Sequence, residues 1–256
     1  MDVSVVPFGS LAFAAAMAIA LFAGFVKGTV GFAMPLILIS GLSSYLPAET
    51  ALAGLILPTL ITNFSQAFRQ GWRAARDSFV QFWRMMVVTV LFIPVGAQLF
   101  DVLPQRAFLL VLGLPVAAYA LALLAGMNLA LKLEHRTRAE IMVGVIGGIY
   151  GGLAGVWGPP VIVLLLSLGT EKTEQVRVQG VLFLVGAIAL FGAHLGTGVL
   201  NPATLPFSAA LVVPALLGMF AGYAVLDRID QRRFRRFTQA LLLLAALNLI
   251  RRALMI

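Results

Sequence analysis

Long apolar stretches, separated by short polar or basic segments, run along the whole chain. Several approach the roughly 20 residues that an α-helix needs to cross the hydrocarbon layer of a membrane. Others are shorter and are bounded by glycine and proline. The pattern predicts an all-α integral membrane protein whose apolar segments are 8–26, 35–46, 50–68, 85–103, 107–127, 141–153, 159–168, 176–195, 205–226 and 237–250.

The composition supports this prediction and excludes several classes of protein. The 256 residues are 61% hydrophobic and 11% charged, whereas soluble domains are about 45–50% apolar and about 25% charged. The chain has no cysteine, which excludes disulfides, thiolate metal sites and cysteine nucleophiles. We expect no cofactor and no metal. The net charge of +8 comes from short segments between apolar stretches, so we expect no nucleic-acid partner.

Residues 69–84 combine four arginines with Trp72, Phe79, Phe82 and Trp83. Aromatic and basic residues together are typical of a segment that lies at the membrane interface. A simple aromatic and basic loop is the alternative.

A short motif occurs twice and indicates an internal repeat. Both 24–35 and 148–159 read G-x3-G-x2-G-x3-P. The spacing predicts two related transmembrane halves, 1–127 and 128–256, as in many transporters. Small residues at such spacings also allow close packing of ordinary helices, which is the alternative.

The distribution of basic residues predicts the orientation in the membrane. Fourteen of the 18 Lys and Arg lie in the segments 69–84, 128–140, 169–177 and 227–236, and such residues concentrate on the cytoplasmic side. Residues 141–168 must then return to the side on which they start. We therefore expect two inverted repeats, each with a Gly/Pro-broken, re-entrant hairpin followed by three spanning helices. Because 8–26 is long enough to cross, five crossings per half is the alternative.

Each predicted hairpin places the beginning of a helix inside the membrane. Non-helical backbone is tolerated there only in contact with protein or a water-filled cavity, and glycine permits such a break. Pro35 and Pro159 suit the first turn of a helix, and the free N–H groups of a helix N-terminus bind anions. Two kinked spans packed through glycine are the alternative.

Lys27 lies at the tip of the first predicted hairpin. A cation at depth costs about 2.5–3.5 kcal/mol, and every Asp and Glu lies in a loop or near the end of a predicted span. An anionic ligand is therefore the expected counter-charge. If the break lies near the surface, Lys27 only extends its ammonium to the interface.

Other polar or aromatic residues complete the predicted substrate-binding set. Arg177 suits oxyanions but could equally be a positive-inside residue. Asn63 and Gln66 could donate to the substrate or join helices. Trp157 could line the site or pack, and His194 could titrate or pack. The full set is Lys27, Gly28, Gly31, Phe32, Pro35, Asn63, Gln66, Gly152, Gly155, Trp157, Pro159, Arg177, Gln179 and His194.

The length, the duplication and the segments GFVKGTVGFAMP and GIYGGLAGVWGP resemble the TauE/SafE family of sulfite and organosulfonate exporters. The resemblance implies sulfite or a C2 or C3 sulfonate as substrate. Phe32, Ala33 and Met34 before Pro35, and Val156 and Trp157 before Gly158, are bulkier than the family's glycine-rich pattern. We expect these bulkier residues to affect which anion the protein carries.

We therefore expect a multi-pass transporter of the cell inner membrane that exports a small anion by alternating access. The partners expected are the anion and the lipid bilayer, and a homo-oligomer stays open. No P-loop, H-E-x-x-H motif or intramembrane carboxylate pair is present, so we do not expect an enzyme. The alternatives are a membrane-embedded enzyme acting on a phosphate or lipid-borne substrate and a small-anion channel.

Overall fold

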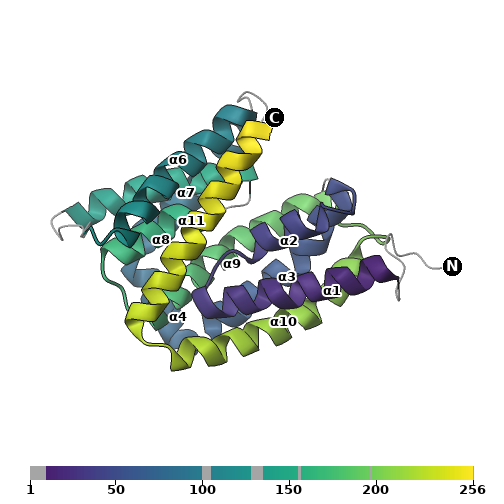
Figure 1. Cartoon of the computed structure of the whole chain (residues 1–256), viewed down its shortest axis with the longest axis horizontal. Coiled ribbons are helices and arrows are strands. Elements are labelled where there is room, and N and C mark those ends of the chain that lie inside the picture. The colour runs from purple at the N-terminus through teal and green to yellow at the C-terminus, as the bar shows by residue number, and fades with distance from the viewer. Residues whose placement is uncertain (1–9, 100–104, 128–134, 155–156, 197, 256) are drawn as a thin grey trace. The chain divides into compact units, whose positions relative to one another are not determined.

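The computed structural model describes residues 10–99, 105–127, 135–154, 157–196 and 198–255. These residues form helices and turns, with no strand among them (Figure 1). The helices are α1 (Leu11–Val30), α2 (Met34–Leu42), α3 (Ala48–Phe68), α4 (Trp72–Gln81), α5 (Trp83–Leu99), α6 (Gln105–Leu124), α7 (Arg136–Ala154), α8 (Gly158–Ser167), α9 (Lys172–Gly196), α10 (Leu205–Arg228) and α11 (Gln231–Met255).

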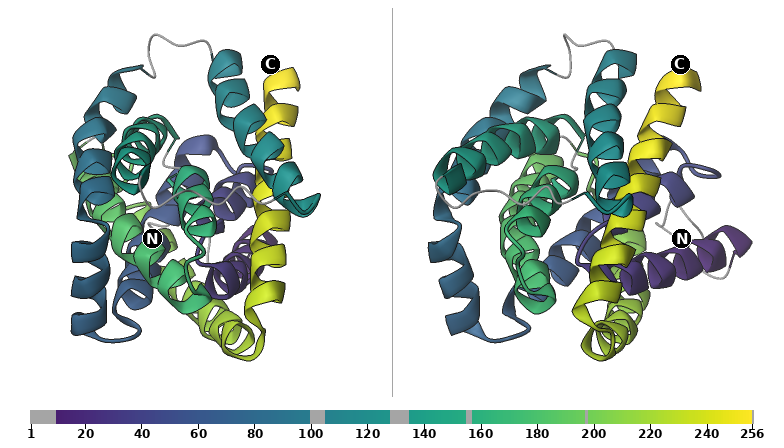
Figure 2. Two further views of the ribbon diagram at one scale, coloured as in Figure 1. Left: turned by 90° about the vertical axis from the view of Figure 1, so that its left-hand side faces the viewer. Right: turned by 60° about the vertical axis from the view of Figure 1, so that its left-hand side comes forward.

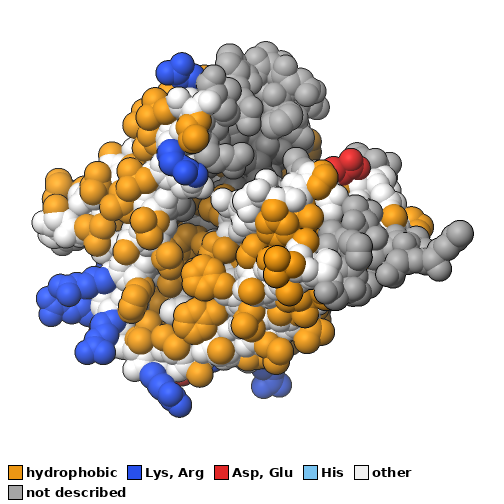
Figure 3. Space-filling model, turned by 45° about the vertical axis from the view of Figure 1, so that its right-hand side comes forward, with side chains coloured by type: hydrophobic (Ala, Val, Ile, Leu, Met, Phe, Trp, Pro, Cys, Tyr) orange, Lys and Arg blue, Asp and Glu red, His pale blue; other side chains and the backbone are white. Residues whose placement is uncertain are grey.

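Five of the described helices are long and apolar enough to cross a membrane: α1, α3, α9, α10 and α11. A sixth span results if α4 and the first part of α5, which meet at an angle of 79°, are taken together. Hydrophobic side chains cover much of the surface, as one face shows in Figure 3. These features confirm the prediction of an all-α, multi-pass membrane protein.

The chain divides into two compact units, each of which combines segments from both predicted halves. Unit 1 contains Met1–Ala75 and Gly180–Arg228, and unit 2 contains Arg76–Gln179 and Ile229–Ile256. In unit 1, α10 packs on α1 and α3. In unit 2, α7 packs on α5, and α11 lies beside α6 (Figure 2). The first helix of each predicted half therefore packs on a late helix of the other half. The repeat boundaries themselves, 1–127 and 128–256, stay a prediction.

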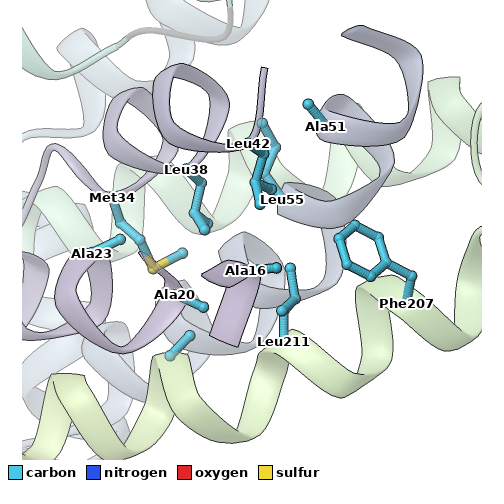
Figure 4. Close-up of a cluster of buried hydrophobic side chains, with 11 residues drawn as sticks. Ala16, Ala20, Ala23, Met34, Leu38, Leu42, Ala51, Leu55, Phe207 and Leu211 are labelled. Carbon is cyan, nitrogen blue, oxygen red and sulfur yellow. The ribbon is translucent and has the colours of Figure 1, made fainter. Parts of the chain in front are cut away.

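Apolar side chains at helical spacing form the core of unit 1 (Figure 4). Three small residues of α1 face α2 and α10, where larger side chains fill the space between the helices. Because alanine adds little width, α1 can approach both neighbours closely. The cluster consists of Ala16, Ala20 and Ala23 on α1, Met34, Leu38 and Leu42 on α2, Ala51 and Leu55 on α3, and Phe207, Leu211 and Ala215 on α10.

Glycines bring the backbones of α1 and α10 into direct contact. A Cβ atom on Gly28 would lie 2.1 Å from the carbonyl oxygen of Met219, and one on Gly222 would lie 2.2 Å from that of Phe25. Gly28 packs α1 on α10, and its predicted role in binding substrate stays a prediction. Unit 2 repeats the arrangement, since a Cβ atom on Gly148 of α7 would lie 2.4 Å from the Thr89 carbonyl oxygen of α5.

The first glycine-rich segment breaks the helix at the predicted place. α1 ends at Gly31 (φ 88°), Ala33 also has a positive φ of 74°, and α2 begins at Met34 with Pro35 in its first turn. The Gly31 carbonyl accepts a hydrogen bond from Gln66, so the break lies beside the last turn of α3. α1 itself is long enough to cross a membrane. Its length is consistent with the alternative of five crossings per half. The re-entrant tip at the membrane centre stays a prediction.

The second break follows the sequence pattern as far as it is described, and the placement of the segment 69–84 at the membrane interface stays a prediction. α7 ends at Ala154 and α8 begins at Gly158, with Pro159 in its first turn, while residues 155–156 lie outside the described part. Most of the segment 69–84 is helical rather than a loop, because α4 occupies Trp72–Gln81. Its Trp72 and Phe79 side chains are exposed.

We predict that Gly222→Ala lowers the melting temperature of the purified protein markedly. The new Cβ atom would overlap the backbone of α1, and overpacking of this kind costs about 1–3 kcal/mol. Gly192→Ala is the matched control, because no atom lies within 4 Å of its added Cβ and alanine favours helix by about 1 kcal/mol. Equal melting temperatures for the two variants would contradict the close contact of α1 and α10.

Single cysteines introduced into the cysteine-free chain test the orientation. We predict that a cysteine at Arg233 is labelled by a membrane-impermeant maleimide only after the cells are opened. One at Pro202, in the turn between α9 and α10, should react in intact cells. Both side chains are exposed, so accessibility to solvent is matched. Rapid labelling at position 233 from outside would reverse the predicted orientation.

Candidate functional site

Lys27 is buried in the last turn of α1, with 1% of its surface exposed. Its ammonium donates to the Thr62 hydroxyl oxygen at 3.0 Å and to the Asn63 side-chain oxygen. Both partners are neutral residues of α3. Among the residues that the structure describes, Lys27 forms no ion pair. Its positive charge is therefore met only by the dipoles of uncharged groups.

The surrounding helices fix both partners of Lys27 in the orientation that accepts a hydrogen bond. The Thr62 hydroxyl donates its proton to the Pro58 carbonyl oxygen at 2.6 Å, which directs a lone pair toward the ammonium. The Asn63 amide nitrogen donates to the Phe183 carbonyl oxygen of α9 at 3.0 Å. Its side-chain oxygen is thereby left to face Lys27.

The helix break lies next to this cluster. Gln66, one turn after Thr62 on α3, donates to the Gly31 carbonyl oxygen at 3.0 Å. The Met34 sulfur lies 3.6 Å from the Thr62 hydroxyl oxygen, so the beginning of α2 contacts the residue that holds the ammonium. The positive φ of Ala33 costs about 1–3 kcal/mol. Backbone strain is thus stored where the chain turns from α1 into α2.

These contacts leave the ammonium able to bind a further group. It carries three N–H donors, of which the Thr62 and Asn63 contacts use two. A buried charge without a counter-charge is unfavourable. An oxyanion beside Lys27 would supply both the missing acceptor and the missing negative charge.

An ion pair joins the ends of α3 and α10, one turn beyond Gln66. The Arg69 guanidinium donates to both carboxylate oxygens of Asp227, at 2.9 and 2.7 Å, and its carbon lies 4.0 Å from the centre of the Tyr223 ring. The sequence analysis missed this group and Thr62. For Thr62, the only signal was its position next to Asn63.

The structure brings together Lys27, Gly31, Asn63 and Gln66 from the predicted set. His194 lies apart from them, about 16 Å further along α9 than Phe183. It is half-buried. Phe32 is buried in the break, and Pro35 is in the first turn of α2.

The remaining predicted residues belong to unit 2. The Arg177 guanidinium donates to the Ser78 hydroxyl at 2.7 Å, and Gln179 is fully buried. The Trp157 indole packs on Gly151, where an added Cβ atom would lie 1.8 Å from its nitrogen. Pro159 opens α8 and Gly152 lies in α7. Gly155 lies outside the described residues.

Metal-ligating side chains are scattered over the part of the chain that the structure describes. No group of three or more His, Cys, Asp or Glu side chains that could hold a metal ion occurs there. Near Lys27, the Thr29 hydroxyl is bound to the Phe25 carbonyl oxygen of its own helix at 3.0 Å.

A double-mutant cycle tests whether Asn63 supports the buried charge. We predict that Asn63→Leu lowers the free energy of unfolding by about 1.5–3 kcal/mol, the usual value of a hydrogen bond to a charged group. In a Lys27→Met background the same change should cost less, because no ammonium is left unpaired. Chemical denaturation in detergent measures all four proteins. Strictly additive effects would show that the two side chains do not interact.

Comparisons with known proteins identify one family. A family model described as sulfite exporter TauE/SafE matches residues 16–249. No curated protein and no solved structure matches the chain significantly. The match covers nearly all of the chain and includes both glycine-rich segments and the helices around Lys27. The protein therefore belongs to the TauE/SafE sulfite exporter family, a family of membrane transporters.

Proposed function

We propose that the protein exports sulfite or a C2 or C3 organosulfonate from the cytoplasm across the cell inner membrane. The observation that carries this proposal is the buried ammonium of Lys27, which has neutral partners and no ion pair among the described residues. The family supplies the class of substrate, because it consists of sulfite exporters.

The bound anion accepts the remaining N–H of Lys27. A sulfonate or sulfite oxygen offers a negatively charged acceptor, so this hydrogen bond is stronger than a neutral one. Thr62 and Asn63 hold the ammonium in place while the site is empty. The beginning of α2 lies beside Thr62 and adds the positive end of a helix dipole. In the sequence repeat, Pro159 at the beginning of α8 corresponds to Pro35 at the beginning of α2.

Transport requires that the site open alternately to each side. The break between α1 and α2 is suited to act as a hinge, because positive φ values at Gly31 and Ala33 interrupt the helix there. The Arg69–Asp227 ion pair joins the ends of α3 and α10 one turn beyond Gln66, and its separation would free these two ends to move apart. Binding of the anion to Lys27 favours the conformation in which the buried charge is neutralised.

The membrane potential favours the outward direction. An inside-negative potential drives a monoanion outward by about 2.3 kcal/mol per 100 mV. Export therefore needs no coupling ion. Import would need one, and no carboxylate of the described residues lies beside Lys27 to bind a proton or sodium ion.

We predict that Lys27→Met lowers the affinity for sulfite or isethionate by about ten- to a hundredfold, because the hydrogen bond to a charged group is lost. Lys27→Arg should not restore it fully, since a planar guanidinium needs a different cavity from an ammonium. Counterflow in proteoliposomes measures transport, and calorimetry on the purified protein measures affinity.

Arg236→Met is the matched control, because it removes the same charge from an exposed position. It should leave affinity and counterflow unchanged. Unchanged anion affinity in folded Lys27→Met would refute the proposed site. Flux that rises linearly with concentration, without saturation or counterflow, would indicate a channel instead.

A further inference from the structure

Two glutamines one turn apart on α9 are buried without a hydrogen-bond partner. Gln175 and Gln179 have 0% of their surface exposed. In both, the side-chain nitrogen and oxygen lack any partner among the described residues. The spacing of four residues places them on the same face of the helix. Both belong to unit 2.

Four unpaired polar atoms in a buried position are unusual. Buried polar side chains nearly always have a partner, and each that does not destabilises the fold. Arg177 lies between the two glutamines in sequence but is turned about 200° from Gln175 on an α-helix. It is bound to Ser78. The two carboxamides therefore form an uncharged polar pair that is separate from the neighbouring guanidinium.

The chemistry of a carboxamide limits what can satisfy the pair. Each side-chain nitrogen donates two hydrogen bonds and each oxygen accepts. A fully ionised sulfonate group can only accept, so it would satisfy the nitrogens and leave the oxygens unpaired. A ligand that carries both an oxyanion and a hydroxyl satisfies both kinds of atom.

We propose that Gln175 and Gln179 bind a small oxyanion that also carries a hydroxyl, such as hydrogensulfite or a 2-hydroxyalkanesulfonate. The nitrogens donate to the oxyanion and at least one oxygen accepts from the hydroxyl. This inference rests on the proposed function and narrows its class of substrate. It also adds Gln175 as a residue that determines specificity.

Isethionate and ethanesulfonate are suitable probes, because they have the same charge and differ only by one hydroxyl. Calorimetry should show that the protein binds isethionate about three- to tenfold more tightly, as expected for one added hydrogen bond. Gln175→Met and Gln179→Met should each reduce this preference to less than about twofold. Gln239→Met, at a buried glutamine of α11, should preserve it.

Melting of the ligand-free variants separates recognition from a structural role. Methionine has a similar length and removes the unpaired amide, so both variants should melt at or above the temperature of the unchanged protein. A large fall in melting temperature would show that the amides are paired within the protein, and would overturn the inference. So would a hydroxyl preference that survives both substitutions.

The same titrations distinguish this inference from the proposed function. Equal affinity of the unchanged protein for the two anions would overturn the role of the glutamines while leaving anion transport intact. Absence of binding for isethionate, ethanesulfonate and sulfite alike would overturn the proposed function, and the inference with it.

Discussion

A positive charge buried among helices, without an acidic partner among the residues that the structure describes, is the constraint on which unit 1 depends. The cost of burying an ammonium falls only if each of its N–H groups has an acceptor. Thr62 and Asn63 provide two such acceptors. They can accept because the Thr62 hydroxyl donates its proton to the Pro58 carbonyl oxygen and the Asn63 amide nitrogen donates to the Phe183 carbonyl oxygen. An oxygen of each side chain is then left to face Lys27. The Asn63 side chain of α3 thereby connects Lys27 of α1 with Phe183 of α9.

This arrangement requires α1 to lie very close to its neighbours. Gly28 and Gly222 allow the backbones of α1 and α10 to touch, while Lys27, the residue before Gly28, reaches α3. The chain then turns sharply at Gly31, whose carbonyl is held by Gln66. Close packing on one face of α1 and polar contacts on another therefore fix the position of the ammonium. An anion that binds there acts on the same residues that connect the helices.

The positions of the helices could be predicted from the sequence because apolar length and Gly/Pro breaks are local signals. Lys27, Asn63 and Gln66 could also be singled out as candidate site residues, since polar residues inside apolar segments are rare. The Arg69–Asp227 pair joins residues 158 positions apart, and no local pattern indicates such a contact. The sequence also could not decide between packing and ligand binding for Gly28, because both require a small residue. Which segments belong to each of the two units also depends on contacts between residues far apart in the sequence.

A crystal structure with 2-bromoethanesulfonate would test most directly whether Lys27 holds the transported anion, since anomalous scattering locates the bromine independently of the protein. If the proposed site is correct, the bromine peak lies beside α1 and α3, and a sulfonate oxygen lies within hydrogen-bonding distance of the Lys27 ammonium. Lys27→Met crystals soaked in the same way should lack the peak. A peak elsewhere, with Lys27 bound only to Thr62 and Asn63, would show that this charge serves the fold and that the anion binds at another position.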